Sequence, residues 1–228
     1  DHKTTEHSAH CVELDPSGNF VFVPHVKPNK IYQFRFDKNK GTLTPNKPPF
    51  VDGPDKEHRY HDPRNYVHHP KLDIGYTSNE NGSGITVWNF DRRTGTLQRG
   101  TTLSALPPDS SGDLFAAGIQ MTPNGRFAYV ANRDQTADRA ASQREDTLAG
   151  FLLDPESGEP ALIGYWPTPN QPFSFCIDRS GRFVFVAGTD TSTLCAYRID
   201  QNTGKLEQFA TYETGELPLW VICQSALE

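Results

Sequence analysis

The sequence predicts an all-β protein assembled from repeated hairpin units. The stretch FAAGIQMTPNGRFAYVANR, residues 115–133, has the pattern of strand, tight turn and strand. Asn-Gly between two alternating apolar runs favours a hairpin, because the turn needs residues that tolerate positive φ. Related patterns return at residues 10–25, 64–80 and 173–189. Eighteen Gly, 18 Pro and 11% aromatic residues also suit many short strands and suit long helices poorly.

Each hairpin is followed by a third strand-like run that ends in aspartate, and then by a turn that ends in glycine. The four pairs are Asp37 with Gly41, Asp91 with Gly95, Asp154 with Gly158, and Asp200 with Gly204. We interpret these aspartates as turn caps and not as metal ligands. A short fourth run completes each unit. Four strands per unit at a period of roughly 50 residues indicate β-propeller blades, and a solenoid is the alternative.

The repeats differ in their connections. The second hairpin turn lacks the glycine, the third repeat carries a polar insertion at residues 134–147, and the connections 44–63 and 104–114 are rich in Pro and charge. The stretch LPLWVI, residues 217–222, is expected to form a fifth inner strand without a second strand after it. We therefore predict that residues 1–228 are the C-terminal part of a single propeller, with four blades and a closing strand, and that the N-terminal blades are absent from this chain.

Composition restricts the function. A net charge of −6 and a pI near 5.7 argue against binding to nucleic acid or to an anionic membrane. No apolar run approaches the ~20 residues of a membrane helix. The four cysteines lie in apolar runs and form no CxxC, so we expect buried free thiols: Cys11, Cys176, Cys195 and Cys223. We expect a cytoplasmic protein.

Comparing equivalent positions in the repeats singles out candidate site residues. Six residues before each hairpin turn, two repeats have His10 and Arg64 where the others have Ala117 and Phe173. Ten residues after the turn, two repeats have Glu80 and Arg133 where the others have Val26 and Thr189. Strand ends of this kind converge at one mouth of a propeller, so the four polar residues are expected to face one another.

These four side chains suit acid–base chemistry on an anionic substrate. His10 and Glu80 can transfer protons, and arginines bind carboxylates or phosphates in a bidentate manner. Arg64 and Arg133 are predicted to hold the substrate, together with Asn79 and Asn132, which precede Glu80 and Arg133. The alternative is an ion-pair network that plugs the channel mouth.

Other candidates are weaker. The histidines in the second repeat match no zinc signature, and neighbours on one strand point to opposite faces: His58, His61, His68 and His69. Gly82-Ser83-Gly84 precedes no helix and is read as a turn. No metal and no cofactor is predicted.

The same motifs resemble those of the seven-bladed propeller lactonases, the family of bacterial propeller-type 6-phosphogluconolactonase and the fungal 3-carboxy-cis,cis-muconate lactonising enzyme. The matching stretches include AHCVELDPSGNFVFVPH, DPRNYVHHP, YTSNENGSGITVWNFD, FAAGIQMTPNGRFAYVANR and TGELPLWV. The resemblance implies that His10, Arg64, Glu80 and Arg133 match the proposed active-site residues of that family. The family often has Pro-Arg where this chain has Pro172-Phe173, which removes one cation.

The resemblance implies a metal-independent enzyme that acts on a lactone of an anionic sugar acid or a related acid. The alternative chemistry is a carboxymuconate-type lactonising cycloisomerase that uses the same site. A non-catalytic binding or scaffold propeller is the alternative from another class. The expected partners are a small anionic lactone or carboxylate and the missing N-terminal blades, which could form a separate chain.

Overall fold

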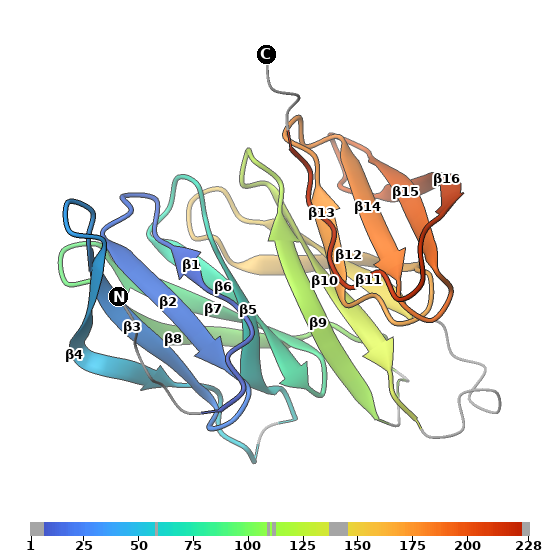
Figure 1. Ribbon diagram of the computed structural model, residues 1–228. Helices are drawn as coiled ribbons and strands as arrows, with labels where there is room; N and C mark the ends of the chain where they lie inside the picture. The colour runs from blue at the N-terminus through green and yellow to red at the C-terminus, as the bar shows by residue number, and fades with distance from the viewer. Residues whose placement is uncertain (1–6, 58, 109, 111–112, 137–145, 225–228) are drawn as a thin grey trace. The chain divides into compact units, whose positions relative to one another are not determined.

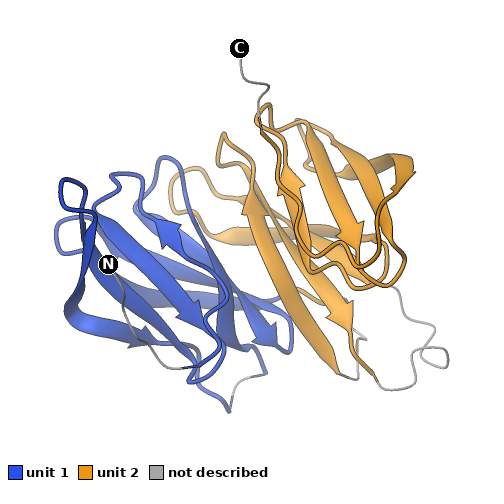
Figure 2. Cartoon of the chain, in the orientation of Figure 1, with its two compact units in different colours: residues 1–104 blue, residues 105–228 orange. Residues whose placement is uncertain are grey.

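The protein is an all-β chain in the computed structural model, which describes residues 7–57, 59–108, 110, 113–136 and 146–224. No helix is assigned among these residues, so none there is long and apolar enough to cross a membrane. The sixteen strands assigned within the described residues form four antiparallel four-stranded blades, as predicted (Figure 1). The chain divides into two compact units, residues 1–104 and 105–228 (Figure 2).

Unit 1 contains two blades, and in each the strands pair in the order of the sequence. The first blade consists of β1 (Glu13–Leu14), β2 (Phe20–His25), β3 (Lys30–Asp37) and β4 (Thr42–Asp52). The second consists of β5 (His61–His68), β6 (Ile74–Asn81), β7 (Gly84–Asp91) and β8 (Thr96–Ser104).

Unit 2 repeats this arrangement. Its first blade consists of β9 (Leu114–Met121), β10 (Phe127–Asp134), β11 (Thr147–Leu153) and β12 (Pro160–Pro167). Its second consists of β13 (Ser174–Ile177), β14 (Phe183–Gly188), β15 (Thr193–Ile199) and β16 (Leu206–Glu213). The predicted third runs coincide with β3 and β7 and end one residue beyond β11 and β15.

The turn aspartates act as the predicted caps. The Asp37 carboxylate accepts hydrogen bonds from the backbone N–H groups of residues 39 and 40, and the backbone N–H of Gly41 donates to the Asp37 carbonyl at 2.8 Å. The same pattern recurs at Asp91, Asp154 and Asp200, where hydrogen bonds to the carboxylate lower its pKa. These local bonds explain why the sequence pattern located the turns.

His69 takes the place of aspartate in the hairpin turn that lacks glycine. Its Nδ1 accepts hydrogen bonds from the backbone N–H groups of Lys71 at 3.1 Å and Leu72 at 2.9 Å. In the first blade, the Asp15 carboxylate accepts from the backbone N–H groups of Asn19 and Phe20, each at 2.8 Å. The imidazole therefore supplies the turn with an acceptor, which gives His69 a structural role.

Each unit has its own hydrophobic core between its two blades. In unit 1, Phe22 of β2 and Phe90 of β7 meet edge to face with centroids 5.7 Å apart, beside the fully buried Trp88. In unit 2, Phe127 and Tyr129 of β10 share a cluster with Phe175 of β13. Burying one such side chain contributes roughly 1.5–3 kcal/mol, so packing between the blades contributes to the stability of each unit.

Two expectations about connections need correction. The stretch 44–63 is not a connection throughout, because β4 continues to Asp52 and β5 begins at His61. β4 is the outermost strand of its blade, where prolines are tolerated because one edge needs no ladder hydrogen bonds. Of the insertion at 134–147, residues 137–145 lie outside the described residues, while Asp134 still belongs to β10 and Thr147 begins β11.

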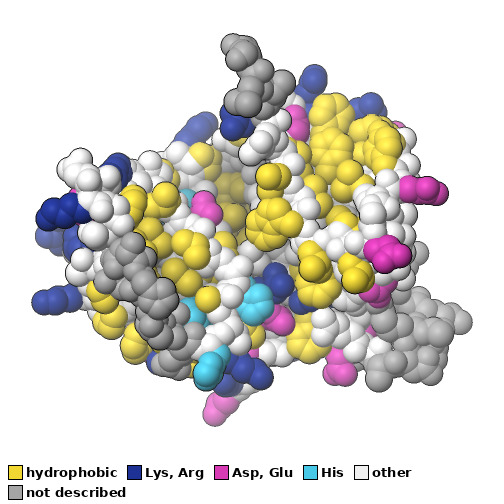
Figure 3. Space-filling model, in the orientation of Figure 1, with side chains coloured by type: hydrophobic (Ala, Val, Ile, Leu, Met, Phe, Trp, Pro, Cys, Tyr) yellow, Lys and Arg dark blue, Asp and Glu magenta, His cyan; other side chains and the backbone are white. Residues whose placement is uncertain are grey.

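The C-terminal stretch 217–222 forms no strand, contrary to expectation. It is held by side-chain contacts instead of a ladder: the Val221 N–H donates to Ser174 Oγ at 3.0 Å, and Thr189 Oγ1 donates to the Pro218 carbonyl at 3.3 Å. Four of its apolar side chains are 59–71% exposed: Leu217, Leu219, Trp220 and Ile222. Figure 3 shows hydrophobic side chains gathered on the face of unit 2.

The expectation of four free thiols is wrong for one pair. Cys176 of β13 and Cys223 form a disulfide with Cα atoms 6.2 Å apart, a separation within the usual range for this bond. Cys11 and Cys195 are free. Sequence spacing could not reveal the pairing, because the two cysteines are 47 residues apart and meet only after the C-terminal segment folds back along β13.

Candidate active site

A register shift sets the direction of the candidate side chains on the first strand of a blade. In β5, Pro63 pairs with Asn79 but Asn65 pairs with Ser78, so Arg64 is an extra residue. β9 is shifted by one residue where Ala117 lies, and the ladder of the first blade is shifted between Ala9 and Glu13, which brackets His10. Such bulges redirect a side chain out of the alternating pattern of the strand.

Unit 1 brings three of the four predicted catalytic residues together. Arg64 Nε donates to Glu80 Oε2 at 3.1 Å, and His10 Nε2 lies 3.9 Å from the same oxygen. The side chains of Arg64, Glu80 and His10 are 12%, 21% and 29% exposed. They are thus partly desolvated, which strengthens their mutual electrostatics, yet each remains accessible from solvent.

The surroundings fix the chemical state of this cluster. Burial lowers the pKa of Arg64, while the Glu80 carboxylate opposes that effect, and an arginine remains charged in either case. Arg64 Nη1 also donates to Asn65 Oδ1 at 2.8 Å. His10 Nδ1 lies 2.9 Å from the Ser8 carbonyl, an acceptor that requires the proton on Nδ1 and directs Nε2 toward Glu80. The imidazole can therefore accept a proton at Nε2.

Arg133 belongs to unit 2, where it lies at the end of β10. Its side chain is buried, Nη2 donates to the Ala116 carbonyl at 3.1 Å, and its guanidinium carbon lies 4.2 Å from the centroid of the Phe173 ring. Phe173 occupies the position in its repeat that Arg64 occupies in the second. Sequence comparison treated Phe173 as a loss of charge and missed that it supports an arginine.

The two predicted substrate-binding asparagines lie inside their blades. Asn79 Nδ2 donates to Thr86 Oγ1 at 2.7 Å, and Asn132 Nδ2 donates to the Ala105 carbonyl at 2.6 Å and to Thr147 Oγ1 at 3.2 Å. Both residues are almost fully buried. The contacts give each amide the same structural role in its repeat, tying the second strand to the third, and a role in substrate binding stays a prediction.

Two further titratable groups lie near the cluster and were not singled out by the repeat comparison. Cys11 Sγ lies 3.9 Å from the Tyr66 carbonyl, and burial raises the pKa of its thiol. Burial also raises the pKa of Glu13 to about 7. Both residues follow His10 at the start of the first blade. The signal that could have identified them in the sequence is a thiol and a carboxyl two residues apart in an apolar run.

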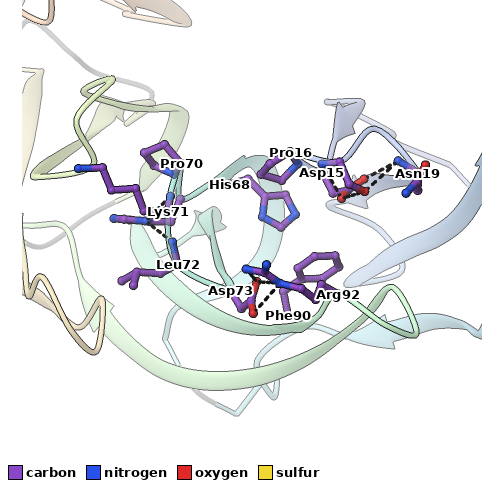
Figure 4. Close-up of a pocket in the computed structure, with 12 residues that line it drawn as sticks. Asp15, Pro16, Asn19, His68, Pro70, Lys71, Leu72, Asp73, Phe90 and Arg92 are labelled. Atoms are coloured by element: carbon purple, nitrogen blue, oxygen red, sulfur yellow. Dashed lines mark hydrogen bonds and ion pairs between the residues drawn. The ribbon is translucent and has the colours of Figure 1, made fainter.

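A separate pocket of about 360 Å³ lies at the opposite end of the second blade (Figure 4). Its lining includes His68, Phe90 and Asp73, the residue before β6, whereas Glu80 lies near the other end of that strand, ~20 Å away at strand rise. Asp73 forms an ion pair with Arg92, with Oδ1 2.7 Å from Nε. The pocket is therefore distinct from the Arg64–Glu80 cluster.

The histidines of the second repeat do not gather around one point. His69 caps its turn, and the His68 ring packs against Phe22 and Phe90 with centroids 5.5 and 4.8 Å apart. His58 lies outside the described residues. Within the part of the chain that the structure describes, no group of three or more His, Cys, Asp or Glu side chains is arranged to hold a metal ion.

Comparison with known protein families matches residues 1–223 to the family described as "Lactonase, 7-bladed beta-propeller". The chain belongs to the seven-bladed β-propeller lactonase family. Curated relatives are the 6-phosphogluconolactonases of Serratia proteamaculans, 34% identical over 212 residues, and of Pectobacterium carotovorum, 33% identical over 215 residues. Each alignment covers 93% of this chain, which spans 60% and 59% of the two relatives.

Two solved structures share the fold. The periplasmic gluconolactonase of Pseudomonas aeruginosa aligns with a TM-score of 0.79 and 23% identity, covering 91% of this chain and 55% of that protein. A protein from Lactobacillus plantarum aligns with a TM-score of 0.79 and 24% identity, covering 93% of this chain and 57% of that protein. The chain therefore shares its fold with part of each of these two proteins.

Proposed function

We propose that the protein containing this chain hydrolyses a lactone of an anionic sugar acid or a related acid. One observation carries the proposal: Arg64, Glu80 and His10 meet at register-shifted strand ends in a lactonase-family blade, with Glu80 Oε2 contacting both partners. Relatives named 6-phosphogluconolactonase at 33–34% identity support the reaction class. That the lactone derives from an anionic sugar acid or a related acid belongs to the proposal.

In this proposal, Glu80 or His10 removes a proton from the water that attacks the lactone carbonyl. Arg64 binds the anionic group of the substrate or stabilises the oxyanion that develops on the carbonyl oxygen, and a substrate-binding role of Arg133, in unit 2, stays a prediction. Fixed donors aimed at developing charge are usually a large contribution to such catalysis. The contact at 3.1 Å between Arg64 Nε and Glu80 Oε2 fixes the position of the carboxylate beside His10.

Two other functions are compatible with the same residues. A carboxymuconate-type cycloisomerase would hold a carboxylate on the arginines and supply a proton from His10 or Glu80. A non-catalytic propeller also predicts an ion pair such as Arg64–Glu80. The remaining exposure of His10 and Glu80, at 29% and 21%, favours an accessible site over a sealed plug.

The test is a substrate panel with site variants of the full-length protein. Phosphorylated and unphosphorylated sugar lactones and carboxymuconate are assayed for turnover with the wild type, His10→Ala and Glu80→Gln. Positioned acid–base groups typically contribute ~10²–10⁴-fold. A loss below tenfold in both variants would rule out this mechanism, turnover of carboxymuconate alone would favour the cycloisomerase, and no turnover of any compound would favour the scaffold.

A further inference from the structure

The side chain that follows Arg64 in the sequence contacts its guanidinium. Arg64 Nη1 donates to Asn65 Oδ1 at 2.8 Å, and Arg64 Nε donates to Glu80 Oε2 at 3.1 Å. Consecutive side chains of a regular strand point to opposite faces, so residues 64 and 65 would not normally meet. The register shift between Pro63 and Asn65 makes Arg64 an extra residue in β5 and allows the contact. The guanidinium is therefore held by two acceptors, one on β5 and one on β6.

Asn65 is itself fixed in place. Its backbone N–H donates to Ser78 Oγ at 3.3 Å, and Ser78 is fully buried and pairs with Asn65 across the ladder. Burial raises the pKa of the Cys11 thiol, and a hydrogen bond with the Asn65 side chain opposes that effect. Because an amide N–H donates to sulfur, this contact assigns Nδ2 to Cys11 and leaves Oδ1 for Arg64. One orientation of the amide thus satisfies both neighbours.

The two acceptors leave the outer edge of the Arg64 guanidinium, formed by Nη1 and Nη2, available for a ligand. Glu80 takes the proton of Nε, and Asn65 takes one of the protons of Nη1. Within the described residues, Arg64 Nη2 makes no hydrogen bond, and it is not one of the buried polar atoms that lack a partner. The outer edge therefore keeps N–H donors on both nitrogens, the arrangement that binds two oxygens of one carboxylate or phosphate.

We propose that Asn65 is a positioning residue that directs the outer edge of Arg64 toward the anionic group of the substrate. The inference rests on the proposed lactone hydrolysis and assigns the carboxylate or phosphate of the substrate to Nη1 and Nη2 of Arg64. Nε remains with Glu80, so one arginine connects the substrate's anion to the carboxylate that lies beside His10.

Asparagine suits this role because it orients the guanidinium without neutralising it. A carboxylate at position 65 would place a second negative charge beside Arg64, in addition to that of Glu80, and would weaken the attraction for an anion. Without an acceptor at position 65, Arg64 would keep its charge and its contact with Glu80, but its outer edge would no longer be held. Holding a binding group in one orientation before the ligand arrives lowers the entropic cost of binding.

NMR of the arginine side chains in labelled full-length protein tests the orientation directly. A held guanidinium gives separate signals for Nη1 and Nη2, whereas rapid rotation merges them. We expect separate Arg64 signals in the wild type and in Asn65→Asp, which keeps an acceptor oxygen, and merged signals in Asn65→Ala. Arg64→Lys assigns the signals. Arg92, which donates to Asp73 at the other end of the blade, is the control, and its signals should not change.

Kinetics with three classes of lactone give the second readout. We expect Asn65→Ala to raise KM about tenfold for a phosphorylated sugar lactone, for a sugar lactone that carries a carboxylate, or for both, in line with a lost hydrogen bond to a charged group. A rise for one of them alone identifies the anion that Arg64 binds. For an uncharged sugar lactone KM should stay within about twofold, and kcat within about threefold for all three. Asn89→Ala, at an exposed position on β7 of the same blade, is the matched control and should change neither value.

The results distinguish a failure of this inference from a failure of the proposed function. Unchanged Arg64 signals in Asn65→Ala would overturn the positioning role of Asn65 even if lactones are turned over. A KM that stays the same for both charged lactones, or rises equally for charged and uncharged lactones, would also overturn it. If the wild type turns over no lactone, the proposed function is wrong, and the assignment of a substrate anion to Arg64 is wrong with it.

Discussion

The guanidinium of Arg133 lies over the ring of Phe173, 4.2 Å from its centroid, inside unit 2. The two residues come from different blades of that unit, β10 and the segment before β13. A phenyl ring without charge positions a buried cation here, because the face of the ring is electron-rich and the site is desolvated. Phe173, which stands where the second repeat has Arg64, therefore still helps to position the side chain of Arg133.

This stacking predicts a binding defect when the ring is removed. Phe173→Leu keeps an apolar side chain but leaves Arg133 without its support, so we expect KM for an anionic lactone to rise about three- to tenfold, in line with a cation–π contact of ~1 kcal/mol. The kcat value should stay within twofold. Phe183→Leu is the matched control, because its ring lies 5.5 Å from the Arg182 guanidinium at an exposed turn. Equal KM changes in both variants would contradict the role of Phe173.

The contact between Arg64 and Glu80 predicts a large catalytic defect with little effect on folding. Glu80→Gln removes the negative charge between Arg64 and His10, so we expect kcat to fall by ~10²-fold or more. The thermal midpoint should change little, since the side chains are partly exposed. Glu207→Gln is the control, because Glu207 pairs with Arg198 at 3.5 Å on the surface. Similar kinetics for the two variants would show that Glu80 has no catalytic function.

The disulfide predicts a measurable loss of stability when it is removed. Cys223→Ser frees the C-terminal segment from β13 and opens a loop of 47 residues, so we expect the free energy of unfolding to fall by about 2–4 kcal/mol. Denaturant titration measures the change, and Cys195→Ser tests the effect of removing a buried thiol alone. Thiol counting in the denatured, unreduced protein should find two reactive cysteines. Four would show that the bond is absent.

Because the imidazole of His68 is buried, we expect the stability of the protein to depend on pH. Burial lowers its pKa to about 4, below the ordinary value of 6.5, so the folded state binds this proton less readily than the unfolded state. The contribution of the neutral imidazole to stability is therefore present above about pH 6.5 and is lost as the pH falls toward 4. We expect His68→Phe, which keeps a ring against Phe22 and Phe90, to reduce this acid destabilisation.

Glu13 is the comparison for the pH dependence of stability attributed to His68, because its contribution to stability changes with pH in the opposite direction. Its pKa is raised by burial to about 7, so the folded state loses stability as the pH rises from about 4.5 to 7. Glu13→Gln should remove that loss and leave the effect of His68 in place. Thermal unfolding of the two variants between pH 4 and 8 measures both slopes, and parallel curves for wild type and His68→Phe would contradict the assignment.

Repetition in the sequence allowed much of the fold to be predicted. The turns depend on local bonds from Asp37 and its equivalents, and the strands on alternating apolar runs, so both are visible in short windows. The convergence of Arg64 and Glu80 followed from comparing equivalent positions. Two features depend on contacts between distant residues and could not be seen: the pairing of Cys176 with Cys223 and the contact of Phe173 with Arg133.

The one-residue register shift in the first strand of a blade separates two requirements on the sequence, namely strand pairing and the choice of the shifted side chain. At the shifted position the side chain leaves the ladder, so His10, Arg64 and Ala117 can differ in size and charge while the strands around them keep their pairing. Substitutions there should alter recognition at little cost in folding. Under the proposed function, single replacements at these positions could change which acid lactone is bound while the backbone stays the same. Each blade could then vary independently of the others.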